Sequence, residues 1–416
     1  MRLDGRNVAA LALLLVVGFV GMSAQWLTDA GEPGPALATS RLILVTNGDD
    51  VGVGSLRQAI FDSNLANGRA RIQFQTRSIT VRTPLPPLVN PAGVVIDGGK
   101  NTEIRADLSK DGPLFDVVSP HVSFSGLKLV HVGGAAILIR GGAVAVTNVE
   151  ISGCGIGIQI GDQVRELIVD GSRFEGNGTG IQIASGGTVT VQKSSFARQL
   201  SAGIWAVGPA DAGPGEPRLI VRDNEFVENR IGAGIINVGA LLSNNGFTKS
   251  RETAVFVSGR GAVIQHNRIG SGAIGVQAED THGLSLVDNE IDHNASMGVL
   301  LRSSSSAMVR ANRVHSNGYG IAIILGAVGN PNLIVDNVLM GQTVDGLFIV
   351  GSSPSLRNNR VMSSSAAGVR VLTYVFPQGR QVAANPSLEN NTLQGNLQDG
   401  PVLGEYRVAP AKSPGP

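Results

Sequence analysis

The chain has 416 residues, a formal net charge of +1, 42% hydrophobic residues and only 4% aromatic residues. A near-neutral charge without a basic patch or run disfavours nucleic acid as a partner. Its one cysteine, Cys154, excludes an internal disulfide, so burial and strand pairing must hold the fold together.

Residues 1–24 are predicted to be a secretory signal peptide that lies outside the fold. Arg2 and Arg6 precede an apolar run, and small residues follow it. An uncleaved membrane anchor through residues 8–22 is the alternative, although this run is short for a membrane span. Residues 25–40 are rich in glycine and proline and are predicted to be a linker. The sequence therefore predicts export to the periplasm, the cell surface or the extracellular space.

Residues 41–118 do not repeat and are predicted to form an N-terminal capping region with the first coils. Ser55 and Gln58 have the spacing of a capping box, which predicts a helix from Ser55 to about Asn64. Such a helix would cover the open strand edges at the start of the fold. The residues expected on its buried face are Leu56, Ala59, Ile60 and Ser63.

Residues 119–404 repeat with a period of about 22 residues, and each copy contains three short strand segments. So short a unit cannot bury its own apolar face and must stack on its neighbours, which predicts a solenoid. One position in each copy is asparagine, or serine in two copies, and is predicted to form a buried hydrogen-bonded ladder. Its members are Ser172, Ser194, Asn224, Asn245, Asn267, Asn289, Asn312, Asn337, Asn359 and Asn391.

A glycine recurs before the last strand of each copy, where it is predicted to permit a positive φ at a corner. These glycines are Gly157, Gly180, Gly203, Gly275, Gly298, Gly320, Gly346 and Gly368.

The run VTNGDDVGVGSLRQAIFDSN, with the later string VVIDGG, resembles the N-terminal segment of many secreted bacterial β-helix proteins of the pectin-lyase-like superfamily. The repeats from about residue 121 to 403 resemble the generic repeat of that superfamily. The resemblance implies an all-β fold, a single-stranded right-handed parallel β-helix of about 12 coils, with a helix-containing cap. Residues 405–416 end in a run rich in proline and are predicted to be a disordered tail. Because the superfamily includes lyases, hydrolases, epimerases, adhesins and scaffolds, the resemblance does not specify an activity.

The outward positions of the glycine-initiated strand form a stripe of aromatic rings among glutamines, which suits stacking on sugar rings. The residues predicted to bind a glycan are Trp205, Phe256, Gln277, Phe348 and Arg370. Insertions at 208–217 and 374–386 leave the same corner and bracket this stripe. The alternative is that the stripe is a patch covered by these insertions or by a partner chain.

Asp292, His293 and His315 are the candidate catalytic residues. The register places Asp292 beside His315, and a histidine beside a carboxylate can act as a general acid or base or can form a metal site. A solvated ion pair is the alternative interpretation. The sequence contains neither the acidic triad of a polygalacturonase nor a calcium-binding repeat, so no metal site and no cofactor are predicted, and calcium has no supporting motif.

The stripe and the resemblance together predict an exported β-helix protein that recognises a polysaccharide or other cell-envelope glycan. Two alternatives stay open. One is a polysaccharide lyase, hydrolase or epimerase that acts through the Asp292 cluster. The other is an envelope scaffold or adhesin that binds protein partners, and the sequence predicts no oligomeric state.

Overall fold

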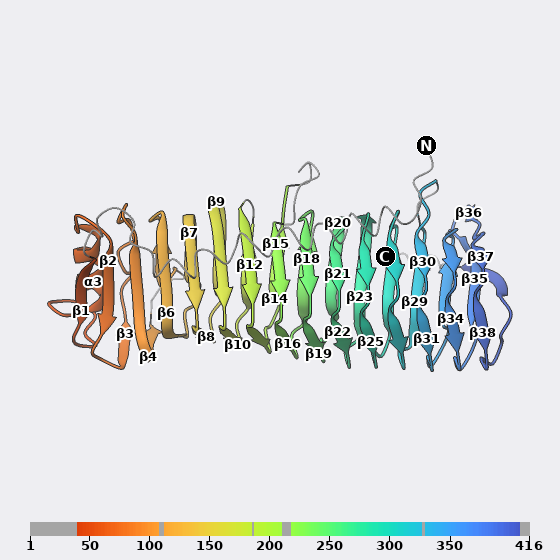
Figure 1. Cartoon of the computed structure of the whole chain (residues 1–416), viewed down its shortest axis with the longest axis horizontal. Helices are drawn as coiled ribbons and strands as arrows, with labels where there is room; N and C mark the ends of the chain where they lie inside the picture. The colour runs from red at the N-terminus through yellow and green to blue at the C-terminus, as the bar shows by residue number, and fades with distance from the viewer. Residues whose placement is uncertain (1–39, 108–111, 185–186, 210–217, 327–328, 408–416) are drawn as a thin grey trace, which may run out of the picture. The chain divides into compact units, whose positions relative to one another are not determined.

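The computed structural model describes residues 40–107, 112–184, 187–209, 218–326 and 329–407. From Arg41 onward the described residues form one compact unit, a parallel β-helix of about 12 turns in which these residues include a single short helix (Figure 1). The predicted fold class is confirmed. The predicted signal peptide, nearly all of the predicted linker and most of the predicted tail lie outside the described residues.

Within the described ranges, no helix combines the length and the apolar character that a membrane span requires.

The N-terminal cap contains the predicted helix. Helix α3 (Leu56–Asn64) begins after Ser55, whose hydroxyl accepts a hydrogen bond from the N–H of Gln58 at 3.2 Å. The reciprocal bond of a capping box is replaced by two others: the Ser55 N–H donates to the carbonyl oxygen of Gly52 at 3.2 Å, and the Gln58 side chain donates to Asp62 at 2.8 Å. All four predicted residues are buried, and α3 packs against β1 (Arg41–Val45) and β2 (Ala70–Phe74).

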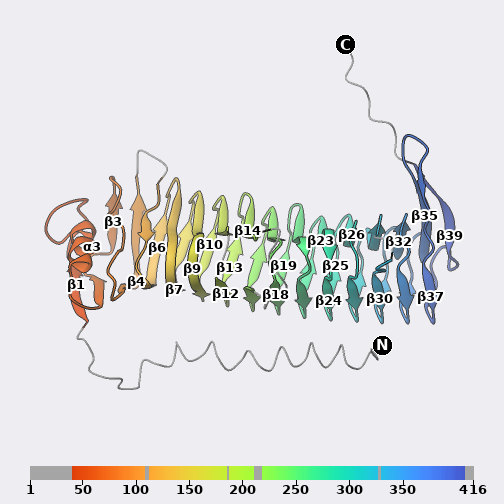
Figure 2. The same cartoon turned by 90° about the horizontal axis from the view of Figure 1, so that it is seen from above.

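The first coils contain long strands that bend across corners of the solenoid. The strands of this region are β3 (Ser78–Val81), β4 (Val94–Ala106), β5 (Phe115–Val117), β6 (His121–Val130), β7 (Ala135–Thr147) and β9 (Ile156–Asp170). In later coils each turn has three separate strands, which stack in parallel into three faces that we call A, B and C (Figure 2).

The strands of face A are β12 (Thr188–Gln192), β15 (Leu219–Arg222), β18 (Ala240–Ser243), β21 (Val263–Gln265), β24 (Ser285–Val287), β27 (Met308–Arg310), β30 (Leu333–Val335), β33 (Ser355–Arg357) and β37 (Ser387–Glu389). Those of face B are β8 (Glu150–Ser152), β10 (Arg173–Glu175), β13 (Ser195–Ala197), β16 (Glu225–Val227), β19 (Gly246–Thr248), β22 (Arg268–Gly270), β25 (Glu290–Asp292), β28 (Arg313–His315), β31 (Val338–Met340), β34 (Arg360–Met362) and β38 (Thr392–Gln394).

Face C, the glycine-initiated one, continues β9 with β11 (Thr179–Ile183), β14 (Ala202–Val207), β17 (Ile231–Ile236), β20 (Thr253–Arg260), β23 (Ile274–His282), β26 (Met297–Arg302), β29 (Tyr319–Ile324), β32 (Leu347–Val350), β35 (Val369–Val375) and β39 (Val402–Arg407). Strand β36 (Gln381–Val382) pairs antiparallel with β35 and turns the second predicted insertion into a hairpin. Most of the first insertion, residues 210–217, lies outside the described residues.

The corner between faces A and B holds the predicted asparagine ladder. The Nδ2 group of Asn289 donates to Oδ1 of Asn312 at 3.0 Å, and Nδ2 of Asn312 donates to Oδ1 of Asn337 at 3.0 Å. The same oxygens accept backbone N–H groups of the preceding coil, as at Asn289 N–H. These side chains are buried, so the ladder is confirmed as an internal structural feature.

A second ladder occupies the corner between faces B and C. The backbone N–H of Asn294 donates to Oδ1 of Asn317 at 2.9 Å, and that of Asn317 donates to Oε1 of Gln342 at 2.9 Å. Asparagine also occupies this position in other coils, at Asn177, Asn229 and Asn396. Glutamines such as Gln199 and Gln342 fill the same position with a longer side chain.

The strand-initial glycines do not have positive φ angles, so the predicted reason for them is wrong. Positive φ falls on polar corner residues instead, such as His266 at 55° and Asp288 at 54°. The glycines of the middle coils make room for a buried ladder of phenylalanines on face B, with ring centroids 4.5 to 4.9 Å apart. The stacked rings belong to Phe174, Phe196, Phe226 and Phe247.

Cys154 begins the second ladder and is buried, and its N–H donates to Oδ1 of Asn177 at 2.9 Å. Burial raises the pKa of its thiol to about 11. Because only the thiolate is nucleophilic, we expect a disulfide reagent at neutral pH to label the folded protein at least about 100-fold more slowly than the protein in urea. The release of the chromogenic thiolate measures both rates. Equal rates would mean that this corner opens readily in the native protein.

Candidate functional site

The five residues predicted to bind a glycan lie in one column on the outside of face C. Trp205 pairs with Gly234, which pairs with Phe256, and Phe256 pairs with Gln277. The column continues through Leu300, Ala322, Phe348 and Arg370. The sequence analysis did not place Gly234 in this column, because the unusually short corner that follows it made the register of this coil uncertain.

Trp205 and Phe256 bring two aromatic rings together in this column. Their rings are 10° from parallel, with centroids 6.4 Å apart, and both side chains are half-buried. A Cβ atom on Gly234 would lie 2.2 Å from the indole ring. The glycine therefore creates the space in which Trp205 lies across β17 toward Phe256.

Gln277 continues this column on its C-terminal side. Its Oε1 accepts a hydrogen bond from Oγ1 of Thr253 at 2.9 Å, and its Nε2 donates to Glu279 at 2.8 Å. Glu279 in turn pairs with Arg302. The amide is thus held in one orientation beside the aromatic rings.

Phe348 and Arg370 are engaged within the protein. Phe348 is only 8% exposed, because it packs with Leu300 and Ala322 and with the ring of Tyr319, whose centroid is 4.9 Å away. Arg370 donates to both carboxylate oxygens of Asp345, at 2.8 and 3.0 Å. The column therefore has an open aromatic part around Trp205 and a packed part around Phe348.

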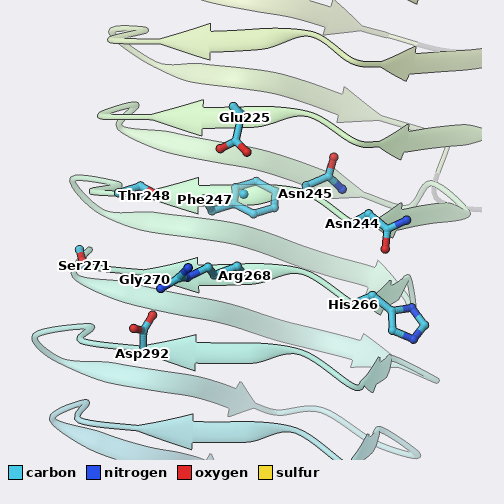
Figure 3. A pocket seen from close by; sticks show the side chains of 11 residues that line it. Glu225, Asn244, Asn245, Phe247, Thr248, His266, Arg268, Gly270, Ser271 and Asp292 are labelled. Atoms are coloured by element: carbon cyan, nitrogen blue, oxygen red, sulfur yellow. The ribbon is translucent and has the colours of Figure 1, made fainter.

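A groove of about 520 Å³ opens on the outside of face B (Figure 3). It exists because two glycines leave space beneath two carboxylates. A Cβ atom on Gly246 would lie 2.3 Å from an oxygen of Glu225, and one on Gly270 would lie 2.1 Å from Oδ1 of Asp292. Figure 3 shows Glu225 and Asp292 at opposite ends of the groove, with Arg268 between them.

The candidate catalytic residues meet at one end of this groove. Asp292 pairs in register with His315, as predicted, and Nδ1 of His293 lies 3.0 Å from Oδ2 of Asp292. The two imidazole rings are perpendicular, with centroids 5.8 Å apart. One ligand atom from each of the three residues lies within 4.8 Å of the others. The carboxylate of Glu290 lies 3.6 Å from Nε2 of His315.

A family described as a right handed beta helix region matches residues 118–240 and 219–361, which together make up more than half of the chain. The protein belongs to this family. The predicted resemblance of the repeats to right-handed β-helix proteins is confirmed, whereas the resemblance of the N-terminal segment lies outside the match and stays a prediction. No curated protein matches the sequence of this β-helix protein.

Solved structures share the fold at low sequence identity. A PL6 family polysaccharide lyase from Pseudopedobacter saltans has a TM-score of 0.54 at 12% identity, over 84% of this chain and 92% of the lyase. The A-module of the mannuronan C-5 epimerase AlgE6 from Azotobacter vinelandii has a TM-score of 0.47 at 13% identity, over 88% and 98%. A double mutant of the periplasmic alginate epimerase AlgG has a TM-score of 0.44 at 16% identity, over 77% of both chains. The likeness to the lyase describes the fold alone and does not assign a reaction to this β-helix protein.

Proposed function

We propose that this β-helix protein binds a polysaccharide along face C, with Trp205 and Phe256 as the stacking surface. The observation that carries the proposal is the pair of near-parallel, half-buried rings on either side of Gly234. The C–H face of a sugar ring is apolar, and half-buried aromatic rings that are held in place by the strands offer it a large, rigid contact area.

Polar groups for the sugar hydroxyls lie on both sides of the rings. Gln182 pairs in register with Trp205, and Gln277 pairs with Phe256. A side-chain amide offers both donors and acceptors, which suits hydroxyl groups that can do both. A flat column of this kind favours an extended polymer over a compact small molecule, because a small ligand needs a concave pocket to bury most of its surface.

Two further points support the proposal. The PL6 family lyase, which shares the fold, acts on a polysaccharide according to its name. The signal peptide expected at residues 1–24 would deliver the protein to a compartment where envelope or extracellular glycans occur. An enzyme acting through Asp292, and a scaffold that binds proteins, stay as alternatives.

Replacing Trp205 or Phe256 with alanine is expected to weaken glycan binding about 10-fold or more, because each ring supplies stacking area. The wild-type protein is first tested on an array of uronate and neutral polysaccharides, and affinities for the best glycan are then measured by calorimetry. Gly234→Ala is an informative third variant, since it displaces the indole without removing an aromatic ring.

Phe61→Ala is the matched control, because Phe61 is an exposed aromatic residue on α3, away from face C. It is expected to bind as the wild-type protein does. An array without a single binding glycan, or unchanged affinity in the Trp205 and Phe256 variants, would show that face C is not a glycan surface. Cleaved or epimerised products in the same mixtures would favour the enzyme alternative.

A further inference from the structure

We propose that Asp292, His293 and His315 form a binding site for a transition-metal ion such as Zn²⁺. The sequence offered a metal site only as one possible role of a histidine beside a carboxylate, and no metal site was predicted from it. The fold brings them together: strand pairing aligns Asp292 with His315, and the corner after β25 adds His293. This inference does not rest on the proposed glycan binding, since the site lies on face B.

The distances suit a single ion. One ligand atom of each residue lies within 4.8 Å of the other two. Bonds of about 2.0 to 2.2 Å from zinc to nitrogen and oxygen in a tetrahedral site place the ligand atoms about 3.4 Å apart, so ion binding requires the side chains to rotate and bring these atoms closer together. The backbone of Asp292 and His315 need not move, because both residues sit within paired strands.

The types of ligand favour a transition metal over calcium or magnesium. Two imidazoles and one carboxylate suit Zn²⁺, Co²⁺ or Fe²⁺, whereas calcium takes six to eight oxygen ligands. The column of Glu290 also contains Arg268 and Arg313, which pair with it in register on either side. These two guanidinium groups offset the negative charge of Glu290. Calcium and magnesium bind mainly through carboxylates, so they would depend on that charge.

The position of the site leaves room for a further ligand. Three protein ligands leave one position of a tetrahedral zinc ion open to water or another molecule. Asp292 lines the groove of face B, and Gly270 presents no side chain beside it. An ion held by Asp292 therefore lies at the end of a groove that can admit a second ligand.

Calorimetry with ZnCl₂ tests the proposal on metal-free full-length protein without a polyhistidine tag. We expect one equivalent of Zn²⁺ to bind, and CoCl₂ to produce the visible absorption bands of a four- or five-coordinate cobalt ion. Each of the substitutions His293→Ala, His315→Ala and Asp292→Asn is expected to lower the affinity for Zn²⁺ at least about 10-fold. Thermal melts establish that each variant is folded.

His266→Ala is the control, because His266 also faces a carboxylate, Asp288 at 3.9 Å, but is not part of the three-residue cluster. It is expected to leave Zn²⁺ binding unchanged, and CaCl₂ is expected to give no binding heat. The proposal is wrong if the wild-type protein binds neither Zn²⁺ nor Co²⁺. It is equally wrong if the His266 variant loses as much affinity as the His315 variant.

Discussion

Replacing Asn312 with leucine is expected to lower the free energy of unfolding by at least about 2 kcal/mol. The Asn312 side chain accepts from the N–H and Nδ2 groups of Asn289, and it donates to Oδ1 of Asn337. Leucine has a similar volume but bonds to none of these groups. Because the site is fully buried, water cannot take the place of the amide.

Urea denaturation of the two proteins measures the loss, and Asn330→Leu is the matched control. Asn330 is exposed, and only its backbone carbonyl is hydrogen-bonded within the described ranges. The control is expected to change stability by less than about 0.5 kcal/mol. Equal losses in the two variants would mean that the side-chain ladder contributes little to the stability of the solenoid.

The asparagine ladder could be predicted because the same polar residue recurs at one position of each repeat, among residues that are mostly apolar. Such a residue at a corner must bond to its own copies, since the neighbouring coil presents the same side chain. The helix of the cap was predictable for a related reason, since Ser55 and the apolar spacing after it are local signals. Both features depend on residues close together in the sequence or in strict repeat.

The phenylalanine ladder carried a sequence signal that could have been found. Phe174, Phe196, Phe226 and Phe247 each follow a position of the first ladder by two residues. Aligning the repeats on that ladder places the rings above one another, and the strand-initial glycines then have a steric reason. Assigning those glycines to positive φ overlooked the side chains that face them across the core.

Whether the residues of the candidate sites are open or covered could not be predicted, because their exposure depends on side-chain packing between distant parts of the chain. Phe348 is buried partly by Tyr319 from the preceding coil, and its ring also lies near Tyr406 from the last strand. The groove exists because Gly246 and Gly270 lack side chains beneath two particular carboxylates. A repeat template averages over such differences, so it locates a column without showing which of its residues are open.

Replacing Gly180 with alanine is expected to destabilise the protein by about 1 to 3 kcal/mol, because the new methyl group has no space. Its Cβ atom would lie 2.4 Å from the carbonyl oxygen of Gly203 and 2.8 Å from the ring of Phe196. The carbonyl belongs to the paired strand of the next coil, and the ring is fixed between two stacked neighbours. Neither group can move without disturbing the adjoining coils, and urea denaturation again measures the loss.

Gly68→Ala is the control, because a Cβ atom there meets nothing within 4 Å and the residue has no positive φ. Alanine gives the unfolded chain fewer conformations than glycine does. This variant should therefore be as stable as the wild-type protein, or more stable by up to about 1 kcal/mol. Adding Phe196→Leu to Gly180→Ala relieves the contact with the ring but not the contact with the carbonyl. The double variant should therefore lose less than the sum of the single losses, since residues in contact are not additive. Strictly additive losses would mean that the glycine and the aromatic ladder are independent, and that the strand-initial glycines do not serve to make room for the stacked rings.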